Sequence, residues 1–263
     1  QTCALPICVN FVRGEVSRVD LDRKSLRLTT GSDLSWQRLV WAVGSVGNTF
    51  NIPGVADHAL QMKDIHQARA IKHALLGMYE LVETGSKPKE DLQAVVVGGG
   101  PTGVEVAGAI AELQKQMRHE FPEIAQHAGV TLLEAGPRLL PTFSNKSSTR
   151  AQSALAKLGV SVMLDAAVDR MYETAVHLKD GQVLSAGTTV WAAGVAAPAQ
   201  WAALATSDRL NRLIVNDHLQ VQDDVWVIGD AAHAADDNGQ PLPMVASVAL
   251  QQGNYVAQSI TGS

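Results

Sequence analysis

The chain of 263 residues has little cysteine, no basic excess and no long apolar run. Its two cysteines, Cys3 and Cys8, form no C-x-x-C pair, so we expect neither a disulfide framework nor a zinc site. Its eight histidines are scattered without the spacing of metal ligands, so we expect no metal. A formal net charge of −5 argues against a nucleic-acid partner. No stretch approaches the roughly 18 apolar residues of a membrane span.

The first seven residues, QTCALPI, match the translation of a common sequencing-adapter end. We therefore exclude residues 1–7 from the fold analysis as an adapter artefact. The alternative is a natural loop of this composition.

The most informative segment reads QAVVVGGGPTGVE, an apolar strand that breaks into a glycine motif and then into a helix. Gly98 permits a tight turn, Gly100 lets the backbone approach a pyrophosphate, and Gly103 lets the helix pack closely on its strand. Pro101 suits a first helical turn, which it shares with Thr102. The N-terminus of this helix would direct its partial positive charge at phosphates. The segment predicts a dinucleotide-binding turn.

The context of the motif strengthens this prediction. A buried-type strand, Val95 to Val97, precedes the turn, and a second strand, Val130 to Leu133, follows the helix and ends at Glu134. An acid at this position accepts hydrogen bonds from the adenosine ribose hydroxyls. Its charge favours NADH over NADPH by repelling a 2′-phosphate, whereas Arg138 could accommodate that phosphate. The alternative is a glycine-rich turn without a ligand.

Periodicity outlines the rest of the fold. Alternation from Val9 predicts an antiparallel hairpin that turns at Arg23 and Lys24. Helical spacing predicts one amphipathic helix over Ile65 to Val82. Ser144 is expected to cap a helix that runs to Leu158. Further strands are expected at Val160 to Leu164, around Val168 to Tyr172, on both sides of the Lys179-Asp180-Gly181 turn, and at Thr188 to Ala193.

Two apolar runs, LVWAVG and VWAAG, are alike. The first ends at Gly44 and the second at Gly194, where the chain is expected to leave a sheet. We expect these to be paired crossover points. A third run, VWVIGD, ends in Gly229 and Asp230. A strand that ends this way lies where open α/β sheets bind ligands, so Asp230 could bind a polyhydroxyl chain. The alternative for Asp230 is a helix cap.

Together, GGGPTGVE, the two crossovers, VWVIGD and the closing PLPMVASVALQQG resemble the two-dinucleotide flavoproteins of the pyridine nucleotide-disulfide oxidoreductase superfamily. Within it the chain is most similar to type II NADH:quinone dehydrogenases, over Val9 to Ser263. The resemblance implies an α/β fold in which a Rossmann-like NAD-binding domain, residues 89–199, is inserted into an incomplete, discontinuous FAD-binding domain with an antiparallel β-meander. The FAD-binding parts would be residues 8–88 and 200–263, with a linker at Gly85 to Pro88.

The resemblance also assigns residues to the cofactors FAD and NADH. It places Glu105 near the nicotinamide and gives Asp230 contact with the flavin ribityl chain. Alternatively, Glu105 is an acid stabilised by the N-terminus of its own helix. The residues expected to bind cofactors are Gly98, Gly100, Pro101, Thr102, Gly103, Glu134, Gly44, Gly194, Gly229, Asp230 and Ala246.

The segment ASVALQQ resembles the quinone-site pattern of that family, except that Ser247 stands where a glutamine is expected. Ala249 and Gly253, with the alanine that opens the segment, share a helix face whose small side chains would let a flat ring approach. Gln251 and Gln252 could offer polar groups to a flavin or a quinone. Alternatively, they are surface glutamines.

The implied activity is an FAD-dependent NADH dehydrogenase that transfers hydride from NADH to flavin and then two electrons to a quinone. Glu105, Gln251 and Gln252 are the side chains expected nearest this chemistry. The alternatives are a soluble NAD(P)H-flavin reductase that uses oxygen or a redox protein, and a non-catalytic NAD-binding module. A disulfide reductase is disfavoured because one branch of the superfamily carries its redox cysteines in the NAD-binding domain, and Lys89 to Trp201 contains none. Branches that carry these cysteines in the N-terminal part stay open.

The family begins with a glycine turn for FAD, and no such motif precedes Gly98. It also ends with a domain that carries an amphipathic membrane-binding helix, and no such domain is found before Ser263. We therefore expect an internal fragment that binds FAD weakly or not at all. Its full-length parent is expected to be cytoplasmic, peripheral on the inner face of the cell membrane, with a homodimer as a possible assembly.

Overall fold

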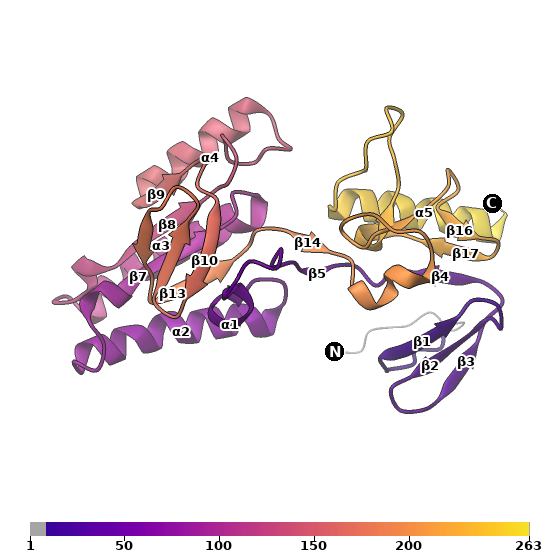
Figure 1. The fold of residues 1–263 in the computed structure, drawn as a ribbon, viewed down its shortest axis with the longest axis horizontal. Coiled ribbons are helices and arrows are strands. Elements are labelled where there is room, and N and C mark those ends of the chain that lie inside the picture. The colour runs from indigo at the N-terminus through magenta and orange to yellow at the C-terminus, as the bar shows by residue number, and fades with distance from the viewer. Residues whose placement is uncertain (1–8, 263) are drawn as a thin grey trace. The chain divides into compact units, whose positions relative to one another are not determined.

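The structure, a computed structural model, describes residues 9–262, so the adapter-like segment 1–7 lies outside the described residues. The chain forms two compact units (Figure 1). One comprises Val46–Val195, and the other combines the residues before Val46 with those after Val195. The chain passes between the units one residue after Gly44 and one residue after Gly194, and these glycines adopt positive φ angles of 68° and 101°. The two predicted crossover points are confirmed.

The boundaries of these units differ from the predicted divisions at residues 88 and 199. Helix α2 (Ile65–Glu83) buries Ile71 and Leu75 in the same apolar cluster as Val96 of the strand before the glycine turn. Residues 46–88 therefore fold with the glycine motif, because α2 needs that sheet to cover its apolar face. The Gly85 to Pro88 stretch lies inside this compact unit and does not link two units.

A parallel sheet forms the centre of the Val46–Val195 unit. In spatial order its strands are β6 (Leu60–Gln61), β13 (Thr188–Trp191), β7 (Gln93–Val97), β8 (Gly129–Leu133) and β9 (Val160–Met163). Helix α3 (Pro101–Glu120) connects β7 to β8, and α4 (Asn145–Leu158) connects β8 to β9. This order of parallel strands and crossover helices confirms the predicted α/β class.

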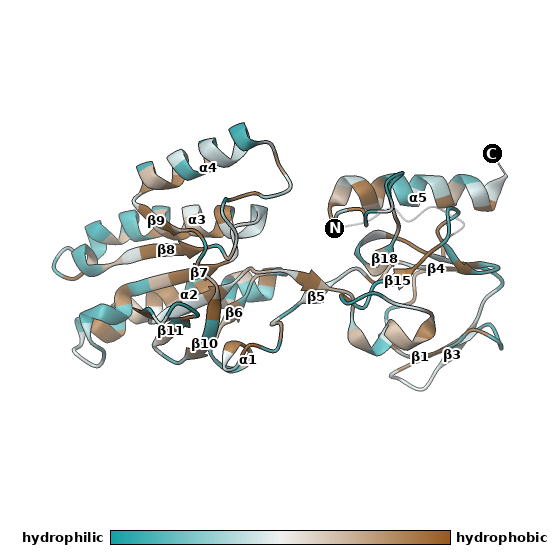
Figure 2. Cartoon of the chain, turned by 45° about the horizontal axis from the view of Figure 1, so that its top comes forward, coloured by the Kyte–Doolittle hydropathy of each residue, from teal (hydrophilic) through white to brown (hydrophobic). Residues whose placement is uncertain are grey.

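Both faces of the sheet are covered, as a parallel sheet requires. Along β7, Ala94 and Val96 enter the cluster formed with the helices, while Val95 and Val97 enter the cluster formed with a β-meander. Strands β7 and β8 are mainly hydrophobic, whereas the helices expose hydrophilic residues (Figure 2). The meander consists of antiparallel β10 (Val168–Tyr172), β11 (Ala175–Leu178) and β12 (Val183–Ser185).

Helix ends in this unit follow the sequence signals. The Ser144 hydroxyl accepts the Ser147 N–H at 3.2 Å, and Gly159 ends α4 with a φ of 86°, so the predicted cap and helix are confirmed. Asp64 caps α2 by accepting the Gln67 N–H at 2.8 Å. The remaining elements of the unit are β5 (Val46–Gly47), α1 (Val55–His58) and the 3₁₀ turns Lys89–Leu92 and Ala125–His127; β14 (Val195–Ala196) pairs with β5.

The second unit combines segments from both ends of the chain. Its elements are β1 (Val16–Asp20), β2 (Ser25–Leu28), β3 (Asp33–Ser35), β4 (Leu39–Trp41), β15 (Leu213–Ile214), β16 (Gln220–Gln222), β17 (Val225–Val227), β18 (Ala232–His233), α5 (Ala246–Thr261) and the 3₁₀ turns Ala199–Leu204 and Gly229–Ala231. Strands β1 and β2 form the predicted hairpin, although its strand begins at Val16 and residues 9–15 lie outside it. Strand β17 runs parallel to β4, which brings their carboxyl ends together.

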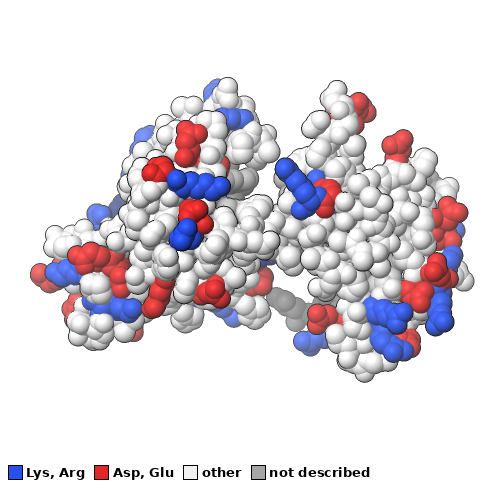
Figure 3. Space-filling model, viewed as in Figure 1, with Lys and Arg blue, Asp and Glu red and all other residues white. Residues whose placement is uncertain are grey.

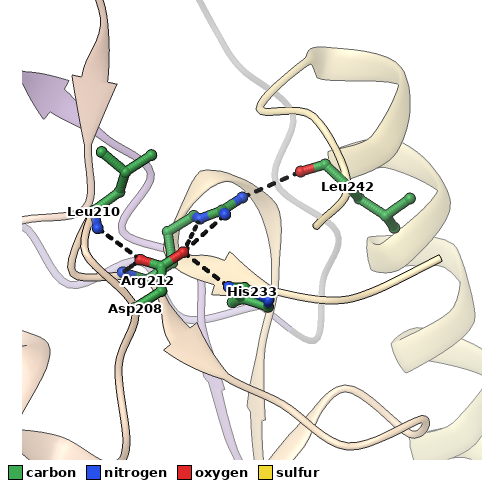
Figure 4. A network of polar contacts seen from close by, with 5 residues as sticks. All are labelled: Asp208, Leu210, Arg212, His233 and Leu242. Carbon is green, nitrogen blue, oxygen red and sulfur yellow. Dashed lines mark hydrogen bonds and ion pairs between the residues drawn. The ribbon is translucent and has the colours of Figure 1, made fainter. Parts of the chain in front are cut away.

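A largely buried polar network connects separate segments of this second unit (Figure 4). The Asp208 carboxylate accepts Arg212 Nη2 at 2.7 Å and His233 Nδ1 at 2.8 Å. Arg212 Nη1 also donates to the Leu242 carbonyl at 3.1 Å. Burial favours a higher pKa for Asp208, but hydrogen bonds from His233, from Arg212 and from the Leu210 N–H outweigh burial and lower this pKa below 3.8. No pattern in the sequence indicated this network.

Acidic and basic side chains are intermingled over the face of the molecule shown in Figure 3. Within residues 9–262, no helix combines the length and apolarity needed to cross a bilayer.

Candidate functional site

A cleft of about 410 Å³ opens at the carboxyl ends of β13, β7 and β8. Every residue of its lining belongs to the Val46–Val195 unit. The lining comprises Phe50, Ile52, Val97, Gly98, Gly99, Gly100, Leu133, Glu134, Ala135, Ala166, Ala167, Val168, Lys179, Trp191, Ala192, Ala193 and Gly194. The carboxyl edge of a parallel sheet is the place where open α/β folds bind ligands.

The glycine turn is sterically closed to side chains at two positions and open at a third. Gly98 has a φ of 113°, and a Cβ there would lie 2.7 Å from the Ala192 carbonyl oxygen. A Cβ on Gly103 would overlap the Gly98 carbonyl oxygen. No atom lies within 4 Å of the Cβ position of Gly100, so its backbone faces open space. Pro101, at the exposed start of α3, leaves the helix N-terminus accessible to an anion.

Glu134 lines the cleft and also holds the glycine turn. Its Oε2 accepts the Gly99 N–H at 2.6 Å, and its Oε1 accepts the Gly136 N–H at 2.7 Å. Each carboxylate oxygen can accept a second hydrogen bond, so these contacts leave capacity for ribose hydroxyls. The turn and the acid therefore form one rigid element.

Arg138, the residue that could accommodate a 2′-phosphate, has another role in the structure. Its guanidinium donates to the Phe143 carbonyl at 3.0 Å, to the Leu140 carbonyl at 3.5 Å and to the Pro141 carbonyl. It thus fixes the loop between β8 and α4, and it does not line the cleft.

Gly194 also lines the cleft, next to an aromatic ring that no sequence pattern indicated. Phe50 has a φ of 52°, and a Cβ on Gly194 would lie 2.7 Å from Phe50 Cζ. The wall beside it is fixed because Trp191 Nε1 donates to the Asn48 carbonyl at 2.8 Å. An aromatic next to Asn-Thr and Asn-Ile in the sequence offers no periodic signal by which it could have been found.

Glu105 lies exposed on α3, the helix that begins at the glycine turn, and it is not part of the cleft lining. Thr102 is exposed at the start of the same helix.

In the second unit, the ends of β4 and β17 meet through a hydrogen bond. The Ser45 hydroxyl donates to Asp230 Oδ2 at 2.5 Å, and Ser45 is buried. Asp230 lies within the 3₁₀ turn Gly229–Ala231 and is not its cap residue, which is Ile228. The N-cap alternative for Asp230 is therefore wrong. Ser45 itself was not identified from the sequence.

The two glutamines of α5 differ in environment. Gln252 is buried, and its Oε1 accepts the Gly229 N–H at 2.7 Å, so the surface alternative is wrong for Gln252. Gln251 is exposed. Both line a cavity of about 400 Å³ together with Asp217, Leu219, Leu242, Val248 and Tyr255.

The small-residue face of α5 packs on the protein itself. The Cβ position of Gly229 lies 3.6 Å from Ala249 Cβ, and that of Gly253 lies 4.0 Å from Ile228 Cδ1. At these two positions the expected approach of a flat ring is replaced by close packing on the turn after β17. Ala246, at the first turn of the helix, is exposed.

The fold and the site define a class of protein. The chain belongs to the pyridine nucleotide-disulphide oxidoreductase family, whose model matches residues 8–253. It is 32% identical over 259 residues to a type II NADH:quinone oxidoreductase of Staphylococcus aureus, with 96% of this chain and 64% of the relative covered. It is 31% identical to a probable mitochondrial NADH-ubiquinone oxidoreductase of Schizosaccharomyces pombe, over 95% of this chain and 49% of the relative. The family resemblance predicted from the sequence is confirmed.

Solved structures of related proteins share this fold. NDH2 from Plasmodium falciparum in complex with NADH aligns with a TM-score of 0.75 and 27% identity, over 84% of this chain and 50% of that one. A ferredoxin reductase from Rhodopseudomonas palustris shares the fold, with a TM-score of 0.76, 19% identity and coverage of 96% and 58%. The chain thus spans about half to two thirds of the length of these relatives.

Proposed function

We propose that the cleft of the Val46–Val195 unit binds NADH. One observation carries this proposal. The Glu134 carboxylate accepts a hydrogen bond from the glycine turn, next to the accessible N-terminus of α3. The pyrophosphate would lie against Gly100 and Pro101, where the structure leaves space for it and free N–H groups stabilise an anion. The adenosine ribose would be held by Glu134, and the nicotinamide would lie toward Gly194.

We propose a flavin site in the second unit, at the joined ends of β4 and β17. Asp230 would bind the ribityl chain, in an orientation set by Ser45. Gly44 suits a close approach because no atom lies within 4 Å of its Cβ position. Gly229 and the exposed Ala246 would border the same ligand. FAD, when bound, would accept hydride from NADH and pass two electrons to a second acceptor.

The activity that we propose for the whole protein is NADH:quinone oxidation-reduction, as the names of its relatives indicate. Gln251 would offer its amide to a quinone carbonyl, since it is exposed at the cavity beside Gln252. Gln252 would act by fixing Gly229 next to Asp230. Glu105, exposed on α3, would shape the electrostatics near the nicotinamide.

The test has two arms, NADH binding by this chain and NADH oxidation by the whole protein. NADH is titrated while the intrinsic emission of the five tryptophans is followed, one of which, Trp191, lines the cleft. NADH oxidation by the whole protein is then measured with added FAD and a short-chain quinone, with oxygen as a comparison acceptor. We expect saturable NADH binding by the chain and quinone-dependent oxidation by the whole protein. An unchanged emission at millimolar NADH would rule out the nucleotide site, and oxidation by oxygen alone would favour a soluble flavin reductase.

We also propose that the whole protein attaches peripherally to the cytoplasmic face of the cell membrane, because long-tailed quinones are dissolved in the bilayer. Co-sedimentation of the protein with lipid vesicles tests this attachment. We propose a homodimer as its assembly, which light scattering in solution tests.

A further inference from the structure

One lysine enters the nucleotide cleft from the β-meander. Lys179 lies in the turn between β11 and β12, and its backbone N–H donates to the Ala167 carbonyl at 2.9 Å. This bond fixes the starting point of a side chain that lines the cleft. Among the residues of the cleft lining, Lys179 is the basic one and Glu134 the acidic one.

The ammonium group of Lys179 is available to a ligand. The neighbouring Asp180 uses its carboxylate within the turn, where it accepts the Gln182 N–H at 2.9 Å and the Gln182 side-chain amide at 2.7 Å. Across residues 9–262, Lys179 has no ion-pair partner. The residue is exposed.

Backbone hydrogen bonds place Lys179 near Glu134, the acid proposed to hold the adenosine ribose. The Ala166 N–H donates to the Glu134 carbonyl at 2.9 Å. Ala167, which accepts the hydrogen bond from the Lys179 N–H, therefore lies next to the segment that carries Glu134. The other basic side chain near this end is Arg138, whose guanidinium is occupied by the carbonyl groups of its own loop.

We propose that Lys179, and not Arg138, is the cation that meets the 2′-phosphate of a bound NADPH, so that Glu134 and Lys179 together set the preference between NADH and NADPH. The proposal rests on the proposed nucleotide site. Glu134 repels a 2′-phosphate, while Lys179 attracts it from the neighbouring segment of the cleft lining. The carboxylate of Glu134 favours NADH, and replacing it by a neutral side chain leaves the attraction of Lys179 unopposed.

The experiment measures Kd for NADH and NADPH by fluorescence titration. Glu134→Gln removes the charge while keeping one acceptor for the glycine turn, and it should tighten NADPH binding about tenfold. Lys179→Met and Arg138→Met are then added separately to this variant. We expect Lys179→Met to weaken NADPH binding about fivefold, with a smaller effect on NADH, and Arg138→Met to leave the NADPH Kd unchanged. Lys157→Ala, an exposed lysine on α4 outside the cleft, is the matched control.

Salt provides an independent readout. The effect of Lys179→Met on NADPH should shrink between low ionic strength and about 0.5 M salt, because exposed charges are screened. Should Glu134→Gln fail to fold, Lys179→Glu in the unaltered chain should widen the ratio of the NADPH and NADH Kd values.

The assignment would be overturned if Arg138→Met abolished the tighter NADPH binding of the Glu134→Gln variant. It would also be overturned if no substitution at Lys179 changed the Kd for NADPH. Failure of the unaltered chain to bind NADH would instead refute the proposed function.

Discussion

The side chain of Gln252 accepts the backbone N–H of Gly229 at 2.7 Å, and this bond joins α5 to the turn that carries Asp230. Gln252 is 6% exposed, so water does not replace the bond if the acceptor is removed. A helix that sequence similarity associates with a quinone thus also shapes the turn proposed to bind a flavin. Its two adjacent glutamines contribute in different ways.

Replacing Gln252 with leucine should therefore destabilise the second unit. The substitution keeps the volume but leaves the Gly229 N–H buried without a partner, at a cost of about 1–3 kcal/mol. Urea denaturation measures the free energy of unfolding. Gln251→Leu is the control, expected within about 0.5 kcal/mol of the unaltered chain because Gln251 is exposed. Equal effects at the two positions would contradict the assigned role.

Gly103→Ala should disrupt the glycine turn. The new Cβ would overlap the Gly98 carbonyl oxygen, so we expect a loss of about 1–3 kcal/mol in unfolding free energy and weaker NADH binding. Gly77→Ala, on α2, is the matched control because no atom lies within 4 Å of its Cβ position. That substitution should stabilise the chain by about 0.5–1 kcal/mol. A neutral Gly103→Ala variant would show that the turn is not closely packed.

Asp208 should make the second unit sensitive to acid. Its pKa is below 3.8 in the folded chain, so the unfolded chain binds the proton more readily. The resulting stability is fully present above about pH 5 and is lost as the pH falls through the folded pKa. Asp208→Asn should lower the unfolding free energy at pH 7 by about 3–5 kcal/mol, since Arg212 then lies buried without its counter-charge.

In the same variant, the decline of stability between pH 5 and pH 3 should be flatter, which denaturation at several pH values measures. Asp217→Asn, at an exposed aspartate of the same unit, should change the unfolding free energy by less than about 0.5 kcal/mol. An unaltered acid transition in Asp208→Asn would show that other carboxylates control it.

Tyr79→Phe should stabilise the Val46–Val195 unit at high pH. Burial raises the pKa of Tyr79 to about 12, and its hydroxyl has no hydrogen-bond partner within residues 9–262. Because the unfolded chain ionises near pH 10, the contribution of the neutral phenol is lost as the pH rises from 10 to 12. The phenylalanine variant keeps the ring packed on Phe121 and should lack this loss. Thermal unfolding at pH 8 and at pH 11 makes the comparison.

Local signals made much of the fold predictable. The Ser144 cap, helix α2 and the Asp-Gly hairpin depend on contacts between residues a few positions apart, and neighbouring residues in the sequence encode such contacts. The strand-to-glycine runs that end at Gly44 and Gly194 were readable because a positive φ selects glycine. The candidate site could be predicted from the sequence only where its residues lie in one short segment, as they do in the glycine turn.

The residues missed were those whose role depends on distant partners. Lys179 and Glu134 are 45 positions apart and share a cleft only because the meander packs on the sheet. Ser45 meets Asp230 because β4 and β17 are parallel neighbours. The placement of α2 also escaped prediction, since its apolar stripe does not specify which sheet will cover it.

The amino-acid sequence alone determined the α/β class, the glycine turn between strand and helix, and the family, because short-range patterns of glycine, apolar residues and caps encode each of them. Only the tertiary structure decided that Arg138 fixes a loop, that Gln252 is buried while Gln251 is not, and that residues 46–88 fold with the glycine motif. The physical reason is that burial and hydrogen-bond partners are properties of packed surfaces, and packing joins residues that the chain separates.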